Sequence, residues 1–454
     1  MFDSIELTRL AFVDAETSLL NWQGLLESES GDEHARRGFL LVRVRWNTAA
    51  SRLSPAAHGE HMKAIAAVLW SVLPEDAELV RYSKGTFAVY VRIGPTGGYP
   101  LRRLAAEIHA ALEAPIVCGD HSLAVSARVA LAADVSSSRD VPELARRAEI
   151  AMRTATVART ETACFTYKVE AAFDRRVALE QALRQAIDED LLEVAFQPII
   201  SLRSGEIVAA EALARWNCPG LGIIAPSEFI GIAQDTGLIV PLGVRMLRAA
   251  CAANGRWQQE GLPKIRVAVN VSLQEIGRRD FVAGVEATLR AAQLGPSSLV
   301  IEVTEAILVN PTAAELHTID ILRGIGVRVA LDDFGTGHSA VTQLRTVDVD
   351  SIKLDRSFIA DIDTDPFLER TTAAIVELAQ LRRLRVVAEG IETAAEALVL
   401  RALGCEEAQG FFIAPPMPGE AFRALLAARR RYDVAPATRP QIGAQVSRTP
   451  TSSR

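Results

Sequence analysis

The second half of the chain alternates short apolar segments with longer amphipathic stretches. Eight segments rich in Val, Ile, Ala and Leu recur: residues 193–200, 207–216, 265–271, 299–305, 327–334, 350–355, 385–392 and 408–414. After the second segment, the gaps are long enough for the crossover helices that parallel strands require. The first gap, "SLRSGE", has only six residues, so the first two strands should form an antiparallel hairpin. The pattern predicts a (β/α)8-like barrel with one antiparallel strand.

A helix is predicted just before this barrel. In residues 173–190, Leu179, Leu183, Ala186 and Ile187 share one helical face and charges fill the other. We therefore expect a domain boundary near residue 170. The predicted domains are 1–170 and 171–432, and the Pro-, Ser-, Thr- and Arg-rich tail 433–454 is predicted to be disordered.

Composition indicates a soluble protein of more than one domain. With 454 residues, the chain is too long to fold around a single ordinary hydrophobic core. Its content of 49% hydrophobic and 23% charged residues is typical of globular proteins. A net charge of −7 argues against a nucleic-acid polymer as the partner. We expect no membrane span, because no apolar run approaches the required length of about 18 residues. The five scattered cysteines without a CxxC motif, and the absence of a secretory signal, predict reduced thiols in the cytoplasm.

Polar side chains stand at or near the ends of seven of the eight predicted strands. They are Glu211, Arg215, Asn270, Glu302, Glu305, Asp332, Asp333, Lys353, Glu389, Glu392 and Gln409. A single acid at such a position is most often a cap or a surface charge. Because barrel active sites lie at the carboxyl ends of the strands, the repetition predicts an acidic, oxygen-rich pocket there.

The residue types in this pocket suit hard divalent cations. Carboxylate and amide oxygens are preferred by Mg²⁺ and Mn²⁺, and no histidine ends a predicted strand. The adjacent Asp332 and Asp333 could serve two ions, a device for phosphodiester cleavage in which Lys353 would orient a water. Gly335 and Gly337 would let the backbone turn sharply after the strand. His338 is interpreted as structural.

The order of motifs resembles the EAL-domain phosphodiesterases of bacterial cyclic-di-GMP signalling. The matching stretches between about residues 175 and 430 are "QPII", "EALARW", "VAVNVS", "EVTE", "LDDFGTG", "IKLDRSFI", "VVAEGIET" and "GCEEAQGFF". The resemblance implies two Mg²⁺ or Mn²⁺ ions, hydrolysis of cyclic-di-GMP to linear pGpG, and a homodimer formed through this domain. Three positions depart from the family pattern: Glu275 stands for Gln, His338 for an aromatic residue and Phe411 for Tyr.

The resemblance also implies roles for single residues. One ion would be held by Glu211, Asn270, Glu302 and Asp332, and the other by Asp332, Asp333 and Glu389. Lys353 would lie by the attacking water, supported by Glu392 and Gln409. Gln197 and Arg215 would contact the substrate, and Glu305 would steady the loop after Asp333. No metal ligand is lost, which favours an active enzyme.

The first half resembles a degenerate GGDEF domain, so the implied fold is a smaller α/β domain followed by the barrel. Residues 14–22, 39–46, 144–156 and 163–167 are similar to that family's opening, first strand, last helix and last strand. The signature loop falls at Ser83, Lys84, Gly85, Thr86 and Phe87, and Arg43 and Arg45 stand where the family has aspartates. Pro74 and Ala77 occupy the family's inhibitory R-x-x-D site.

These replacements put cations where a cyclase would bind Mg²⁺, so no cyclase activity is expected. The domain could be structural or dimerising, or it could bind an anionic ligand through Lys84, Arg43 and Arg45. For the whole chain, the alternative to a phosphodiesterase is a catalytically silent cyclic-di-GMP receptor or scaffold. A barrel hydrolase for another phosphodiester is a further possibility.

Overall fold

The structure is a computed structural model. It describes residues 11–28, 36–46, 55–93, 101–118, 121–133, 140–308, 311–335 and 347–432. The predicted tail 433–454, Gly337 and His338 lie outside these residues. The chain forms two compact units, Met1–Ala178 (the N-terminal unit) and Leu179–Arg454 (the barrel unit), and the division falls inside helix α6 (Tyr167–Asp188).

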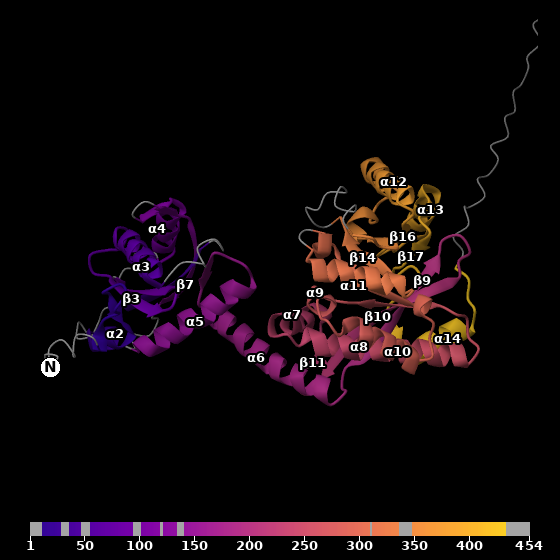
Figure 1. Cartoon of the computed structure of the whole chain (residues 1–454), viewed down its shortest axis with the longest axis horizontal. Coiled ribbons are helices and arrows are strands. Elements are labelled where there is room, and N and C mark those ends of the chain that lie inside the picture. The colour runs from indigo at the N-terminus through magenta and orange to yellow at the C-terminus, as the bar shows by residue number, and fades with distance from the viewer. Residues whose placement is uncertain are drawn as a thin grey trace, which may run out of the picture. The chain divides into compact units, whose positions relative to one another are not determined.

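The N-terminal unit is a six-stranded sheet with helices on both faces (Figure 1). Its strand order is β1 (Leu20–Asn21), β3 (Glu78–Ser83), β4 (Thr86–Ile93), β2 (Arg36–Trp46), β7 (Val125–Ala133) and β8 (Thr162–Cys164). Side chains alternate between the two faces of a strand. Leu40 and Val42 therefore pack with helices α3 (Pro55–Trp70) and α4 (Leu101–Glu113). Phe39 and Leu41 pack on the opposite face with α2 (Trp22–Ser28) and α5 (Val141–Val157). A small hairpin, β5 (Ile116–Cys118) and β6 (His121–Leu123), completes the unit.

The barrel unit closes eight strands on themselves, which confirms the predicted fold class. The strands are β9 (Glu193–Ser201), β10 (Ile207–Cys218), β12 (Arg266–Asn270), β13 (Leu299–Thr304), β14 (Arg328–Phe334), β15 (Ser351–Leu354), β16 (Arg385–Ala388) and β17 (Glu407–Ala408). Neighbours from β10 to β17 pair in parallel. Strand β9 runs antiparallel to both β10 and β17, as the short first gap predicts. Two short strands that the sequence did not predict, β11 (Gly222–Ile224) and β18 (Met417–Pro418), extend the sheet.

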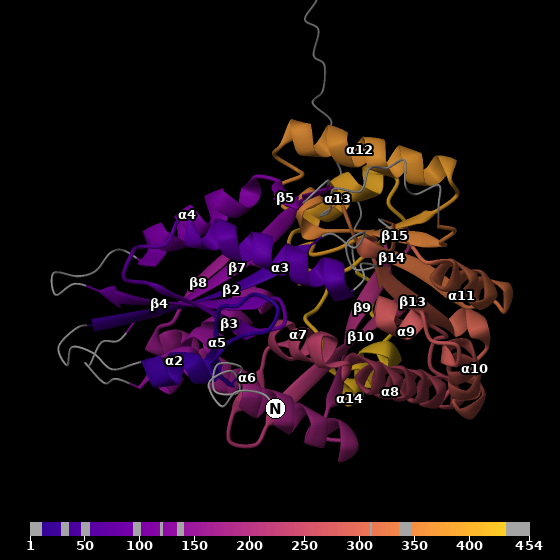
Figure 2. The same cartoon turned by 60° about the vertical axis from the view of Figure 1, so that its left-hand side comes forward.

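Helices lie outside the strands of the barrel (Figure 2). They are α7 (Pro226–Thr236), α8 (Ile239–Gln259), α9 (Leu273–Ile276), α10 (Phe281–Ala291), α11 (Ala313–Gly324), α12 (Pro366–Leu381), α13 (Ala394–Leu403) and α14 (Gly419–Ala427). Local sequence sets several starts. Thr312 with Glu315, and Thr393 with Glu396, form capping boxes that satisfy backbone N–H groups at the first turn. These caps fix where the chain leaves each preceding loop and enters the outer layer.

The predicted extent of the eighth strand is largely wrong. Of residues 408–414, only Ala408 belongs to a strand, and the chain turns immediately afterwards. The turn requires a glycine, because a Cβ on Gly410 would lie 2.2 Å from the carbonyl oxygen of Ile391. Gln409 nevertheless follows the strand directly, so the prediction of its place at the strand end is unaffected.

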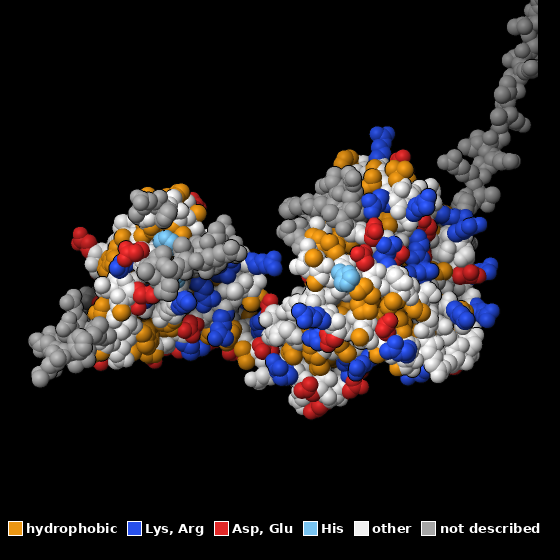
Figure 3. Space-filling view, viewed as in Figure 1, with side chains coloured by type: hydrophobic (Ala, Val, Ile, Leu, Met, Phe, Trp, Pro, Cys, Tyr) orange, Lys and Arg blue, Asp and Glu red, His pale blue; other side chains and the backbone are white. Residues whose placement is uncertain are grey.

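Charged side chains of both signs are interspersed over the faces of the units seen in Figure 3. Within the described residues, no helix is long and apolar enough to cross a membrane.

One buried carboxyl group lies in the outer layer of the barrel unit. Glu275 is 3% exposed, and its Oε2 accepts hydrogen bonds from the backbone N and Oγ of Ser272, at 2.9 and 2.6 Å. A Cβ on Gly243 of α8 would lie 1.8 Å from Glu275 Oε1, so the carboxyl sits directly against that helix. Burial raises the pKa of Glu275 to about 7, against the opposing effect of the Ser272 hydrogen bonds.

Glu275 should make the barrel unit less stable as pH rises. The unfolded carboxyl releases its proton near pH 4.3, whereas the folded one keeps it until about pH 7, so the contribution to stability is lost between these values. Glu275→Gln should therefore raise the free energy of unfolding at pH 8 by about 1–3 kcal/mol and change it little at pH 4.5. Urea unfolding at both pH values measures this. Glu369→Gln, at an exposed position, is the control, and a pH-independent gain for Glu275→Gln would contradict the account.

Candidate active site at the mouth of the barrel

Strand alternation delivers the polar residues of the site to the inside of the barrel. Apolar side chains fill the deeper interior, as the buried clusters of Ile199, Ala209 and Val387 and of Ala268, Val300 and Ala330 show. Two residues further along each strand, the same inward direction is taken by polar side chains. Those successors are Glu211, Asn270, Glu302, Asp332 and Glu389. The site therefore forms a layer directly above a narrow apolar floor.

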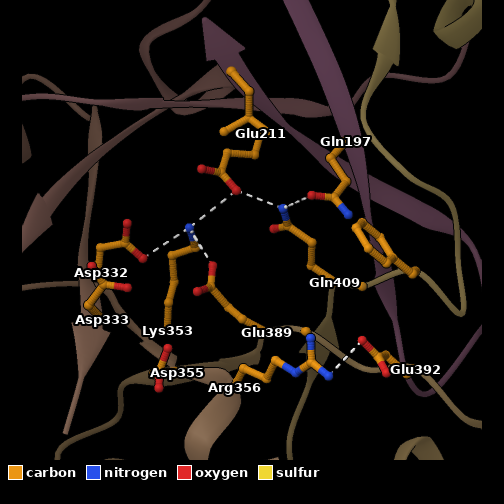
Figure 4. Close-up of a pocket in the computed structure, with 14 residues that line it drawn as sticks. Gln197, Glu211, Asp332, Asp333, Lys353, Asp355, Arg356, Glu389, Glu392 and Gln409 are labelled. Atoms are coloured by element: carbon orange, nitrogen blue, oxygen red, sulfur yellow. Dashed lines mark hydrogen bonds and ion pairs between the residues drawn. The ribbon is translucent and has the colours of Figure 1, made fainter. Parts of the chain in front are cut away.

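Lys353 stands at the centre of this layer. It is 1% exposed, and its ammonium group contacts four carboxylates, three of them drawn in Figure 4. The distances from Nζ are 2.6 Å to Glu389 Oε1, 3.0 Å to Glu302 Oε1, 3.1 Å to Asp332 Oδ1 and 3.5 Å to Glu211 Oε2. The four carboxylates carry more negative charge than one ammonium can neutralise.

Burial and the neighbouring charges together shift the pKa values of these groups. Burial alone would lower the pKa of Lys353, but the surrounding carboxylates outweigh it and hold that pKa well above its usual value. Burial raises the pKa of Glu302 well above its ordinary range and that of Glu389 to about 8, and neighbouring acids add to both shifts. Burial and the adjacent Asp332 also raise the pKa of Asp333. Such crowding favours either protons or additional cations in the site.

Lys353 and two amide groups hold Glu211 in its ionised form. Burial works to raise its pKa, but Lys353 and two amide donors together keep that pKa below its usual value. Asn270 Nδ2 donates to Glu211 Oε1 at 2.8 Å, and Gln409 Nε2 donates to Oε2 at 2.6 Å. Gln409 Nε2 also donates to Gln197 Oε1 at 2.9 Å, so Gln197 of β9 joins the same network (Figure 4).

An open cavity of about 340 Å³ lies above these groups. Its wall includes Gln197, Glu211, Asp332, Asp333, Lys353, Glu389, Glu392 and Gln409, which the sequence predicted, together with Leu213, Asp355, Arg356 and Phe411. The cavity thus brings most of the predicted residues together at one mouth of the barrel.

The donor set fits a divalent cation. Oxygens of Asp332, Asp333 and Glu389 all lie within 4.8 Å of one another. Glu302 Oε2 is buried without a hydrogen-bond partner among the residues that the structure describes, so one lone-pair-bearing oxygen faces the interior unsatisfied. Carboxylate and amide oxygens without histidine are the ligands that Mg²⁺ and Mn²⁺ prefer.

Three predicted residues lie at the margin of the site. Glu305 Oε2 accepts a hydrogen bond from the backbone N of Gly335 at 2.9 Å, next to the loop after Asp333. Glu392 lines the cavity, but its carboxylate pairs with Arg356 at 2.8 Å rather than with Lys353 (Figure 4). Arg215 lines a neighbouring cavity of about 460 Å³ whose wall includes Asn270, and its Nη1 donates to the carbonyl oxygen of Ala214.

Sequence reasoning missed Asp355 and Arg356. Asp355 follows β15 directly and caps the 3-10 turn η5 (Arg356–Phe358), where its Oδ1 accepts from Ser357 N at 2.9 Å. An acid two residues after Lys353 was a visible signal in "IKLD". Arg356 gave no such signal, because a basic residue in a turn is usually solvated.

The chain resembles proteins of known family over the residues that build this site. It is 30% identical over 425 residues to the signaling protein YkoW of Bacillus subtilis, covering 92% of this chain and 53% of YkoW. It is 38% identical over 265 residues to the cyclic di-GMP phosphodiesterase NbdA of Pseudomonas aeruginosa, covering 58% of this chain and 34% of NbdA. The solved PaMucR phosphodiesterase in complex with c-di-GMP has a TM-score of 0.51 and 36% identity, covering 54% of this chain and 99% of that one.

The chain spans about half of YkoW and about a third of NbdA. The EAL domain family itself matches residues 180–416, which hold all eight barrel strands and every residue of the charged layer. Because this match extends over more than half of the 454 residues, the chain belongs to the EAL domain family.

Proposed function

We propose that the barrel unit is a metal-dependent phosphodiesterase that hydrolyses cyclic-di-GMP to linear pGpG. The observation that carries this proposal is the gathering of Glu211, Glu302, Asp332 and Glu389 around Lys353. The name of NbdA and the ligand of the PaMucR complex support the choice of substrate. The reduced, cytoplasmic setting and the homodimer remain predictions.

Two ions, Mg²⁺ or Mn²⁺, are the proposed cofactors. Glu211, Asn270, Glu302 and Asp332 would hold one, and Asp332, Asp333 and Glu389 the other. When bound, such ions lower the pKa of a coordinated water and neutralise charge on the phosphate oxygens. They would also offset the burial and the repulsion among carboxylates that together raise the pKa values of Glu302 and Glu389.

The remaining residues act on the substrate and the water. Lys353 keeps its proton because four carboxylates surround it. We propose that it lies by the attacking water, which its Nζ would orient. Gln409 fixes Glu211 and Gln197 in one network, which holds the water shell in place. Gln197 and Arg215 would contact the substrate, with Arg215 serving the adjacent cavity. Glu305 would steady the backbone at Gly335, and Glu392 would act from the rim through Arg356.

We also propose that residues 1–170 are a degenerate GGDEF-like domain with a regulatory or dimerising role. Arg43 of β2 pairs directly with Arg128 of β7, so both side chains share one face of the sheet. Arg45 lies on the same face two residues on. Burial lowers the pKa of Arg128, and Arg45 and Arg43 lower it further. This cationic face, next to the β3–β4 hairpin that carries Lys84, would repel Mg²⁺.

Product analysis with labelled cyclic-di-GMP tests the barrel's activity. In the presence of Mg²⁺ or Mn²⁺, the full chain should form pGpG. Asp332→Asn should lower kcat/KM by about 100-fold or more, because it removes a carboxylate proposed to serve both ions. Asp363→Asn, at an exposed position of the same unit, should leave the rate unchanged. Binding of cyclic-di-GMP without any pGpG would favour the receptor or scaffold instead, and cleavage of linear dinucleotides alone would indicate another substrate.

The N-terminal unit should not synthesise cyclic-di-GMP. The expected result is no labelled cyclic-di-GMP from GTP and Mg²⁺ or Mn²⁺, because Arg43, Arg45 and Lys84 stand in place of metal-binding carboxylates. The assay uses the Asp332→Asn chain, so that any product would survive hydrolysis. Product accumulating above a protein-free blank would contradict the proposed degeneracy.

A further inference from the structure

The 3-10 turn η5, Arg356–Phe358, lies beside two glycines that follow carboxylates of the site. It follows β15, which bears Lys353, and begins at the cap formed by Asp355. On one side is Gly335, which follows the strand β14 that carries Asp332 and Asp333. On the other is Gly390, which follows Glu389. Both glycines have a positive φ, 99° for Gly335 and 72° for Gly390.

Phe358 packs on the backbone of Gly335. A Cβ on that glycine would lie 2.3 and 2.5 Å from two atoms of the Phe358 ring, so the ring occupies the space that any other side chain would need. Asp333, two residues earlier, itself has a φ of 54°, an uncommon conformation for a residue with a side chain. The loop at Gly335 is therefore held by Phe358 on one side and by the hydrogen bond to Glu305 at 2.9 Å.

Arg356 packs on Gly390 in the same way. A Cβ on Gly390 would lie 2.9 Å from both Cβ and Cγ of Arg356. The guanidinium of Arg356 reaches past it to Glu392, at 2.8 Å (Figure 4). Because both side chains of this ion pair are exposed, the pair itself contributes little, and the packed stem of Arg356 is the more important contact.

The turn is fixed from behind by helix α12. Thr372 of that helix is fully buried, and its Oγ1 donates to the carbonyl oxygen of Phe358 at 3.0 Å. Helix α12 therefore holds the turn in place independently of its contacts with Gly335 and Gly390.

We propose that Phe358 and Arg356 are positioning residues that set the spacing between the Asp332–Asp333 pair and Glu389. When ionised, these three carboxylates repel one another, and their oxygens lie within 4.8 Å. Contacts that hold the backbone at Gly335 and at Gly390 against the same turn oppose that repulsion before a cation binds. The two residues thereby preorganise the second ion's ligands and raise its affinity. This inference rests on the metal dependence in the proposed function.

Isothermal titration with Mn²⁺, without cyclic-di-GMP, measures the effect on the full chain. Phe358→Ala should weaken Mn²⁺ binding by about tenfold, as loss of groups that orient metal ligands does. Phe358→Leu, which refills much of the space, should lose less. Phe367→Ala removes a ring that is 78% exposed on α12 and should bind Mn²⁺ as the wild type does. With cyclic-di-GMP added, raising Mn²⁺ should return the rate of Phe358→Ala toward that of the wild type, because metal affinity is what it lacks.

Gly335→Ala provides a test that does not depend on how well Phe358→Ala folds. The added methyl group and the Phe358 ring cannot share the same space, so Phe358→Ala should recover part of the Mn²⁺ affinity that Gly335→Ala loses. Additive losses in this double-mutant cycle would overturn the proposal. Mn²⁺ affinity of Phe358→Ala within twofold of the wild type would do the same. If the wild type binds Mn²⁺ but does not hydrolyse cyclic-di-GMP, the proposed function is contradicted, whereas the positioning role of Phe358 is not.

Discussion

The site depends on the buried contact between the ammonium group of Lys353 and four carboxylates. A single lysine cannot compensate Glu211, Glu302, Asp332 and Glu389. Burial raises the pKa values of Glu302 and Glu389, and the neighbouring acids raise them further. Burying such a group of charges is costly unless further positive charge arrives. The barrel fold brings these carboxylates together, because alternate residues of each strand point inward. The last inward-pointing residues of the strands all lie at the same end of the barrel. Divalent cations are the natural complement of this arrangement.

The sign of the charged side chains on the sheet differs between the two units. In the barrel unit, oxygen donors occupy the inward strand ends. In the N-terminal unit, Arg43 and Arg128 are directly paired on neighbouring strands, so cationic side chains share one face of the sheet. Charge sign, rather than fold, therefore distinguishes a surface suited to cations from one that excludes them. This contrast is why we propose chemistry for one unit and a regulatory or dimerising role for the other.

Much of the barrel could be predicted from sequence because its signals are periodic. The eight strands, the reversed β9 and the polar layer follow from segment spacing and from which residues end each segment. The eighth strand was overestimated, because "AQGFFIA" is apolar enough for a strand but Gly410 needs a turn against Ile391, a tertiary contact that no local pattern reveals. The partner of Glu392 was missed for the same reason. Arg356 is near it only because η5 and the loop after β16 meet in space.

Three glycines at the mouth are required by close contacts with segments that are distant in the sequence. Gly335, Gly390 and Gly410 all lie at the mouth, and at each one a Cβ would collide with a neighbouring segment. They let backbones approach closely enough for carboxylates from separate strands to share one cavity. A site of this density thus requires both closely spaced carboxylates and residues without side chains.

Anomalous diffraction from crystals soaked in Mn²⁺ would locate the ions in the barrel unit. We expect two anomalous peaks at the mouth of the barrel, one against Glu211, Asn270, Glu302 and Asp332, and one against Asp332, Asp333 and Glu389. Peaks confined to other surfaces, or a mouth that remains without Mn²⁺ at saturating concentration, would contradict this expectation.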